Sequence, residues 1–582
     1  MPKVWNIGNT TVRNPKRIEK ALKVFYEEGF SGNAKGPERE VRLHSKLKEK
    51  EVVDPEGTES DWNGRKWRAA FYQLGFISYE KYSIEGVKYN SREFFQKIGI
   101  SSIESPFQLT PSGLKLISAT MVPEIEEVYT RQFACYEIPN SLESGFPEGK
   151  MKPFILFLEI LNKLQNNNLL GLNKFETGLF IQKFRNHTPN LLNEIYDEII
   201  EYRKRIGDCN GSQEIKQVRN LYLDELAKFS EIDPLSVVRD YADTTFRYFS
   251  LSGLFTRIGD SIIIRDNKRE FVNELLQSEP VFWNNSKPYD YFNFFYTNSY
   301  LIPTDDINIA LSEISFLKKG ISRKDHHLLL EANKLTPESE ISLVQKIRYN
   351  LIEYNNWERE QDFANVQREK ESINEIISYL KALNNEPISQ KLEIDDRPAF
   401  LEWAVWRSFL AINDIIIPIH ETRRFPIDQD FMPRNVAPGG GSDLLFEFEN
   451  YVLIVEVTLT ISNRQMAVES EPVRRHTVQY KERYPNKDVY CLFIAPSLDN
   501  NIVETFRIGV WYNADEEEFV NIIPMSLTDF IYLIEVLITK RFNNSDFKNL
   551  LDRCLIFRNV RAPQWKKTIQ SEVLQWKRKF LN

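Results

Sequence analysis

Two acidic residues in the last third of the chain occupy positions where a carboxylate can do chemistry. Asp443 ends the sequence PGGGSD, and Glu456 follows thirteen residues later inside the apolar sequence LIVEV. A charge is costly to bury in such a strand unless it is paired or bound to a metal. If the two acids converge, their oxygens suit Mg²⁺, a hard cation that prefers oxygen ligands. The alternative is an acid at a sheet edge and an ordinary aspartate in a turn.

Two β-strands are predicted to carry these acids. Residues 444–448 and 452–460 are rich in apolar and β-branched side chains, which favour strands, and a chain reversal fits between them. Asp443 would then begin one strand, while Glu456 would lie inside its neighbour. This arrangement is what a shared metal site requires.

A helix and a third strand are predicted to follow. Ser470 suits an N-cap and Pro472 the first turn, so residues 473–483 should form a helix. Residues 489–494 are expected to form a strand. A helix that joins two strands of one sheet is typical of a parallel crossover connection, so we expect a mixed sheet.

Further polar residues lie close to Glu456 in the sequence. Glu469 follows it by another thirteen residues, and Glu471 is a close competitor for the same role. One side of the predicted helix would carry Arg475, His476, Gln479 and Glu482. Such side chains can accept a proton from water or orient an anionic substrate.

Glu402 is an acid in another apolar segment. A helix is predicted from residue 396 onward, and Glu402 shares one of its faces with bulky apolar side chains. A buried carboxylate needs a partner or a metal. Glu402 therefore either pairs with Arg407 or Arg423, or belongs to the same site as the other acids.

Two stretches in the first half of the chain have the order of a winged helix, a helix followed by a hairpin. The first covers residues 63–118, with strands expected at 76–78 and 107–109, and the second covers residues 244–265. A short helix with cations on its outer side fits the major groove of DNA, where arginine reads guanine. For each residue the alternative is an ordinary surface position. The candidates for DNA contact are Arg65, Lys66, Arg68 and Gln73 in the first stretch and Arg247, Arg257 and Arg265 in the second.

The composition is that of a globular protein with several domains. The 582 residues are 42% hydrophobic and 27% charged, which excludes a fibrous or wholly disordered chain. No apolar run approaches the about 20 residues that cross a bilayer, so we expect no membrane partner. Four cysteines far apart in sequence fit a reducing cytoplasm. The net charge is −8, yet residues 1–50 hold twelve Lys and Arg against six acids, so nucleic acid stays a possible partner.

The fold class expected from these patterns is α+β with several domains. Residues 1–282 are predicted to form a mostly helical region with winged-helix-like subdomains. Residues 283–390 are predicted to form a helical linker, and residues 391–582 an α/β/α core with a mixed sheet.

Several motifs together resemble those of the AlwI-type restriction endonucleases and their relatives PleI and MlyI. The motifs are EWxxWR from Glu402, SDL from Ser442, VEVTL from Val455, RQ from Arg464 and EPVRRH from Glu471. The two acids also resemble the PD-(D/E)xK nuclease signature, with Thr458 in place of its lysine. The AlwI-type family shares this departure, so it does not by itself indicate an inactive protein.

The resemblance implies a type IIS restriction endonuclease. Its N-terminal region would recognise a short asymmetric site in double-stranded DNA, and a PD-(D/E)xK-like domain would hydrolyse phosphodiester bonds outside that site with Mg²⁺. Asp443, Glu456 and the carbonyl of Val457 would hold the metal. Three other acids are candidates for catalysis, with Glu469 also a candidate metal ligand: Glu469, Glu471 and Glu402. The candidates that would orient the phosphate are His476, Gln479 and Arg475, and Arg475 is also a candidate DNA-binding residue.

The resemblance also implies partners. A cognate DNA methyltransferase would be the functional partner in a bacterial cytoplasm, and a transient homodimer or a small subunit would cut the second strand. Three alternatives stay open. The first is a strand-specific nicking enzyme of the same family. The second is a nuclease for RNA or for particular nucleic-acid structures, and the third is a non-catalytic DNA-binding protein with a decayed nuclease domain.

Overall fold

The computed structural model divides into two compact units, Met1–Glu353 and Tyr354–Asn582. It describes residues 4–12, 14–50, 52–53, 63–84, 86–138, 150–184, 186–188, 190–285, 288–321, 326–389, 392, 394–412, 414–461, 463–513 and 516–581. Most of these residues are helical, and none of the helices combines the length and apolar character needed to span a membrane. The sequence predicted three parts, with boundaries at residues 282 and 390, whereas the structure divides into two units. The three-part division stays a prediction.

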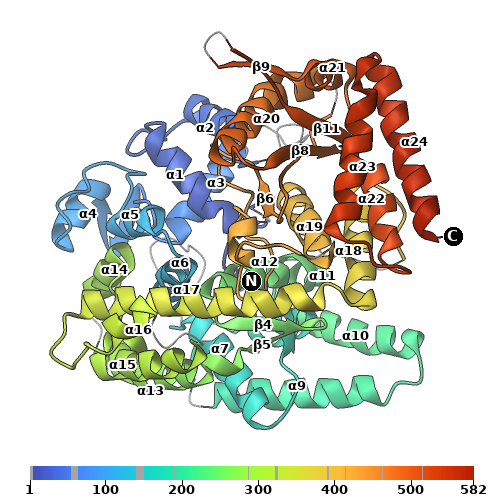
Figure 1. The fold of residues 1–582 in the computed structure, drawn as a ribbon. Helices are drawn as coiled ribbons and strands as arrows, with labels where there is room; N and C mark the ends of the chain where they lie inside the picture. The colour runs from blue at the N-terminus through green and yellow to red at the C-terminus, as the bar shows by residue number, and fades with distance from the viewer. Residues whose placement is uncertain are drawn as a thin grey trace. The chain divides into compact units, whose positions relative to one another are not determined.

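The first unit is mainly helical (Figure 1). Its principal helices, apart from those described below, are α1 (Ile18–Glu27), α2 (Pro37–Glu49), α4 (Ser91–Lys97), α7 (Pro153–Asn166), α9 (Leu191–Gly207), α10 (Ser212–Ala227), α13 (Arg269–Asn285), α15 (Ile307–Leu317) and α16 (His327–Ala332). The long helix α17 (Ile341–Val366) contains the boundary between the two units.

Residues 63–118 form the two expected helices and, between the strands predicted at 76–78 and 107–109, a hairpin that was not predicted there. These elements are α3 (Asn63–Gln73), β1 (Lys81–Ile84), β2 (Val87–Asn90) and α5 (Pro111–Ser118). The side chain of Thr110 caps α5 by accepting a hydrogen bond from the Gly113 N–H. The two short strands predicted around Ile77 and Leu109 are reduced to a single antiparallel bridge. A helix followed by a hairpin is thus present, while the winged-helix assignment stays a prediction.

The second predicted hairpin also follows its helix. α12 (Ala242–Phe249) leads to Gly253, which has φ +68°, and then to β4 (Phe255–Ile258) and β5 (Ser261–Ile264). β5 pairs antiparallel with both β4 and β3 (Leu172–Asn173). The positive φ explains why glycine ends this helix.

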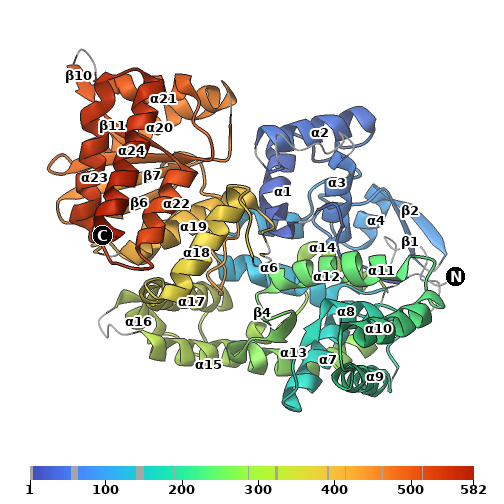
Figure 2. The same ribbon diagram turned by 90° about the vertical axis from the view of Figure 1, so that its right-hand side faces the viewer.

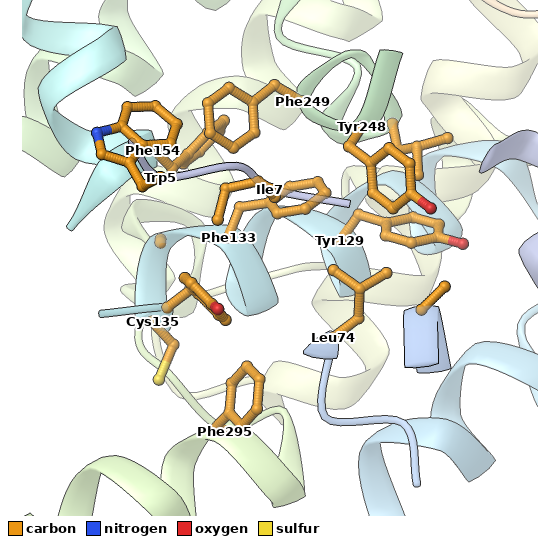
Figure 3. Close-up of a cluster of buried hydrophobic side chains, with 14 of the residues drawn as sticks. Trp5, Ile7, Leu74, Tyr129, Phe133, Cys135, Phe154, Tyr248, Phe249 and Phe295 are labelled. Carbon is orange, nitrogen blue, oxygen red and sulfur yellow. The ribbon is translucent and has the colours of Figure 1, made fainter. Parts of the chain in front are cut away.

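Aromatic side chains form the core of the first unit (Figure 3). Phe133 on α6 (Val122–Cys135) contacts Phe154 and Phe249 with ring centroids 5.5 and 5.4 Å apart. The same core includes Phe295 on α14 (Pro288–Thr297). The start of the predicted linker therefore packs within the first unit.

The second unit contains a four-stranded mixed sheet. Its strands are β6 (Leu444–Glu447), β7 (Tyr451–Val457), β8 (Asp488–Ala495) and β11 (Asn521–Ser526), in the order β11-β8-β7-β6. β6 runs antiparallel to β7, whereas β7, β8 and β11 are parallel. The predicted mixed sheet is confirmed, and α20 (Asn463–Arg483) connects β7 to β8 as expected. A separate hairpin pairs β9 (Val510–Asn513) with β10 (Glu516–Phe519).

Helices cover both faces of this sheet (Figures 1 and 2). α20 and α21 (Asn500–Ile508) cover one face, where Phe493 contacts Phe506. On the other face, Phe409 of α19 (Arg397–Ile412) packs on Phe446 with ring centroids 4.7 Å apart. The remaining helices of the unit are α18 (Lys370–Leu383), α22 (Leu527–Val536), α23 (Asn544–Ile556) and α24 (Ala562–Leu581).

The predicted start of α20 is wrong. The helix begins at Asn463 rather than after Ser470, and Pro472 lies inside it although proline removes one helical hydrogen bond. Buried Gln465 explains the early start. Its side chain donates to the carbonyls of Thr460 and Ser497 and accepts from the Asp499 N–H, which ties the first turn to neighbouring loops.

Phe409→Ala is expected to destabilise the second unit by about 3–5 kcal/mol, because a large cavity would replace the ring between α19 and the sheet. Urea unfolding followed by the fluorescence of Trp403 and Trp406, which lie in the same core, measures the loss. The control is Phe557→Ala, whose side chain is 42% exposed and whose loss should cost at most about 0.5 kcal/mol. Equal midpoints for the two variants would contradict this packing.

Candidate active site

Strand pairing brings Asp443 next to Glu456. Leu444 lies opposite Val455 in the antiparallel pair, so the residue before Leu444 lies beside the residue after Val455. The backbone N–H of Val457 donates a hydrogen bond of 2.9 Å to Asp443 Oδ2. The two acids predicted to converge are thus neighbours at one end of the sheet.

Burial and the charges of neighbouring acids both raise the pKa values of these carboxyls. Burial, with the charge of Glu469 as the next cause, raises the pKa of Glu456 to about 8. Burial and the charge of Glu456 raise the pKa of Asp443 well above its ordinary value. The ionised forms are therefore unfavourable unless a cation lies close by.

Glu402 belongs to the same cluster. Its carboxylate accepts a hydrogen bond of 2.7 Å from the Ala437 N–H, in the loop that leads to Asp443. Burial and the charge of Asp443 raise the pKa of Glu402 well above its ordinary value. Of the two open alternatives for this acid, the structure favours a place near the site.

The two arginines proposed as partners of Glu402 have other partners. Arg407 forms an ion pair of 2.7 Å with Glu375, and Arg423 pairs with Glu360. Among the residues that the structure describes, neither arginine forms an ion pair with Glu402. The predicted pairing of Glu402 with either arginine is therefore not observed, and its role in catalysis stays a prediction.

His476 reaches the cluster from α20. Its Nδ1 lies 2.8 Å from Glu456 Oε1, and its buried Nε2 has no hydrogen-bond partner in the described part of the chain. Burial, followed by the charge of Arg475, lowers the pKa of the His476 imidazole. A neutral ring with one unused nitrogen is suited to a proton or to a group of the substrate.

The two competing acids on α20 differ in their surroundings. Glu469 is half-buried, and its charge acts on both Asp443 and Glu456. Glu471 is exposed and forms an ion pair of 2.9 Å with Arg475. Glu469 is consequently the better placed candidate.

The position of the motif lysine offers no cation. Thr458 is buried, and its hydroxyl oxygen accepts a hydrogen bond of 3.0 Å from the Thr460 N–H. Sequence reasoning missed a cation that does lie near the cluster, Arg424, whose charge lowers the pKa of Glu456 and of His476. Nothing in its spacing from Asp443 marks it, because only the folded loop brings it near.

Two of the four DNA-binding candidates on α3 are held inside the first unit. Gln73 exchanges hydrogen bonds of 3.0 and 3.2 Å with the backbone near the N-terminus. Arg68 forms an ion pair with Glu40. Arg65 is exposed and Lys66 is half-buried. The DNA contacts of all four stay predictions, with Arg65 the most open of them.

The other cationic candidates are spread over both units. Arg247 pairs with Asp243 at 2.7 Å on α12. Arg257 is exposed on β4, and Arg265 is half-buried just after β5. Arg475 lies on α20 in the second unit, half-buried. Their roles in DNA binding likewise stay predictions.

The donor set at the sheet end fits a divalent metal such as Mg²⁺. No group of three or more His, Cys, Asp or Glu side chains in the described residues is already arranged as a metal site. However, Asp443 and Glu456 supply adjacent carboxylate oxygens, which Mg²⁺ prefers, and this ion usually keeps several waters rather than a full protein cage. A cation would also offset the repulsion that raises the pKa values of these acids.

Two solved structures show limited similarity to the chain. One is the crystal structure of the small subunit of the heterodimeric restriction endonuclease R.BspD6I, with 22% identity, a TM-score of 0.28, and coverage of 35% of this chain and 98% of that chain. The other contains the BpuJ1 endonuclease binding domain with pyrene- and phenanthrene-modified DNA, with 14% identity, a TM-score of 0.24, and coverage of 44% and 84%. Scores this low support no conclusion about this chain.

Comparison with protein families is decisive. A search of curated proteins gave no match. The family described as AlwI restriction endonuclease matches residues 72–533, a range that includes the whole acidic cluster. The class defined by this match is that of the restriction endonucleases, nucleases that act on DNA. The protein belongs to the AlwI restriction endonuclease family, and the resemblance drawn from the motifs is confirmed.

Asp443→Asn is expected to raise the melting temperature of the protein in EDTA. The asparagine side chain keeps an oxygen that accepts the hydrogen bond from the Val457 N–H. It removes a carboxyl whose ionised form is destabilised by burial, so the free energy of unfolding should rise. A gain of about 2–4 °C corresponds to about 1 kcal/mol in a unit of this size. Calorimetry measures the shift. Asp552→Asn is the control and should give no gain, because Asp552 pairs with Lys548; a lower melting temperature for Asp443→Asn would contradict the repulsion.

Proposed function

We propose that this restriction endonuclease is a type IIS enzyme. It recognises a short asymmetric site in double-stranded DNA and hydrolyses phosphodiester bonds outside that site with Mg²⁺. The observation that carries the metal-dependent hydrolysis is the cluster of acids at the sheet end, where half-buried Asp443 and buried Glu456 lie side by side and position 458 supplies no lysine. A PD-(D/E)xK-like site is the arrangement that uses such a pair.

Each residue of the cluster has a proposed task. Asp443, Glu456 and the backbone carbonyl of Val457 hold Mg²⁺, which when bound polarises the phosphate and lowers the pKa of water. Glu469, half-buried beside them, accepts the proton of the attacking water. Water forms a bond to phosphorus while the bond to the leaving nucleoside oxygen breaks.

His476 and Glu402 complete the proposed site. His476 Nδ1 donates the hydrogen bond that fixes the Glu456 carboxylate, and Nε2 donates to the phosphate once the ring carries a second proton. Glu402 positions the loop before Asp443 through the Ala437 N–H. Arg475 on the same helix contacts the DNA backbone.

Recognition is assigned to the N-terminal region. Residues 1–282 contain both winged-helix-like stretches, and the exposed arginines Arg65 and Arg257 are the first candidates for base or phosphate contacts. Residues 283–390 connect this region to the nuclease domain, 391–582. A cognate DNA methyltransferase protects the host site, and a second subunit or copy cuts the other strand.

Asp443→Ala and Glu456→Ala should each lower the rate of DNA cleavage at least about 10³-fold, since a lost metal contact removes several kcal/mol of charge stabilisation. Cleavage of a plasmid in Mg²⁺ is followed by separating nicked from linear product. Binding of the uncut site in Ca²⁺ should persist for both variants, because recognition lies elsewhere in the chain. Normal cleavage by either variant would show that the site is misassigned, and accumulation of nicked plasmid by the wild type would identify a strand-specific nicking enzyme.

Mg²⁺ should stabilise the wild type but not an Asp443→Asn, Glu456→Gln double variant. At about 100 times its dissociation constant, a ligand specific for the folded state adds about 2.7 kcal/mol of stability. Melting temperatures with and without Mg²⁺, in the absence of DNA, measure the difference. The same rise in both proteins would place the ion elsewhere.

A further inference from the structure

Arg424 lies beside the acidic cluster because its segment extends the sheet. Arg423 forms an antiparallel bridge with Leu444, and the Arg424 N–H donates a hydrogen bond of 3.3 Å to the Asp443 carbonyl. Side chains alternate along an extended segment, so the two arginines point to opposite sides. Arg423 faces Glu360 and the ring of Trp406, which leaves the other side to Arg424.

The glycine-rich loop before Asp443 holds the Arg424 guanidinium. Nη2 donates to the Gly439 carbonyl at 3.2 Å, and Nη1 donates to the Ser442 carbonyl at 3.4 Å. A Cβ atom on Gly441 would lie 2.6 Å from Nη1, so this glycine makes room for the side chain. These bonds use two of the five N–H donors that an arginine carries.

The positive charge of Arg424 is not neutralised by an acid. Among the residues that the structure describes, no carboxylate forms an ion pair with it, whereas Arg423 and Arg475 each have an acidic partner. Its charge nevertheless acts on Glu456 and His476. A half-buried guanidinium with unused donors, held by backbone carbonyls beside acids, is arranged for an anion from outside the chain.

We propose that Arg424 binds the non-bridging oxygens of the phosphate that is cut, and so takes the place left by the motif lysine. The inference rests on the proposed function. As water attacks phosphorus, negative charge grows on these oxygens, and a fixed guanidinium stabilises the transition state more than the ground state. The glycine-rich loop thus has a task of its own, which is to orient this side chain.

Single-turnover cleavage tests the proposal. Arg424→Ala should cut about 10²–10³-fold more slowly than the wild type, the usual effect of losing one donor to transition-state charge. Arg424→Lys should show a smaller loss, because lysine keeps the charge but not the planar fork. Arg553→Ala, which removes a 45% exposed arginine on α23, is the matched control and should cut normally. A wild-type rate for Arg424→Ala would overturn the inference.

A binding experiment provides a readout that a purely structural role would not change. DNA with a neutral methylphosphonate at the cut position is compared with natural DNA in Ca²⁺. The wild type should bind the modified DNA more weakly, and Arg424→Ala should show a smaller loss, because its own contact is already gone while those of the metal ion and of His476 stay. Equal losses in the two proteins would overturn the proposal. If the wild type does not cut DNA, the proposed function itself is wrong. If the wild type cuts DNA and Arg424→Ala cuts at the same rate, only the inference about Arg424 is wrong.

Discussion

The second unit is organised around a cluster of poorly solvated carboxylates, of which Glu456 and Glu402 are buried and Asp443 is half-buried. Burial is the largest cause that raises the pKa values of Asp443, Glu456 and Glu402, and the charge of Glu456 adds to the rise for the other two. Without a cation, this arrangement opposes folding, because each acid must bind a proton or stay charged in a poorly solvated place. The rest of the unit must therefore supply the free energy that keeps these acids together.

The packing around the sheet supplies that free energy. Phe409 joins α19 to the sheet and to α22 and α23 through its contacts with Phe446, Phe530 and Phe547. On the other face, α20 holds His476 against Glu456. Because the acids destabilise the folded unit when no cation is bound, binding a cation stabilises the fold more strongly. The lower stability of the unit is thus linked to its affinity for the cation.

Sequence patterns predicted the parts of the site that depend on local structure. An acid inside the apolar sequence LIVEV indicated Glu456, and the neighbouring strands predicted its meeting with Asp443, which strand pairing shows. The start of α20 was predicted wrongly because Ser470 and Pro472 are strong local signals, whereas Gln465 acts through distant loops. The surroundings of Glu402 and of Arg424 could not be predicted for the same reason, since the loops that lead to Asp443 create both.

The most direct test of the account is the position of a divalent ion in crystals of the protein with uncut DNA. Mn²⁺ can replace Mg²⁺ and is located by its anomalous scattering. The account predicts a peak about 2.1 Å from carboxylate oxygens of Asp443 and Glu456, at the distance typical of such ligands. A crystal with Mn²⁺ bound at the DNA but away from both acids would contradict it.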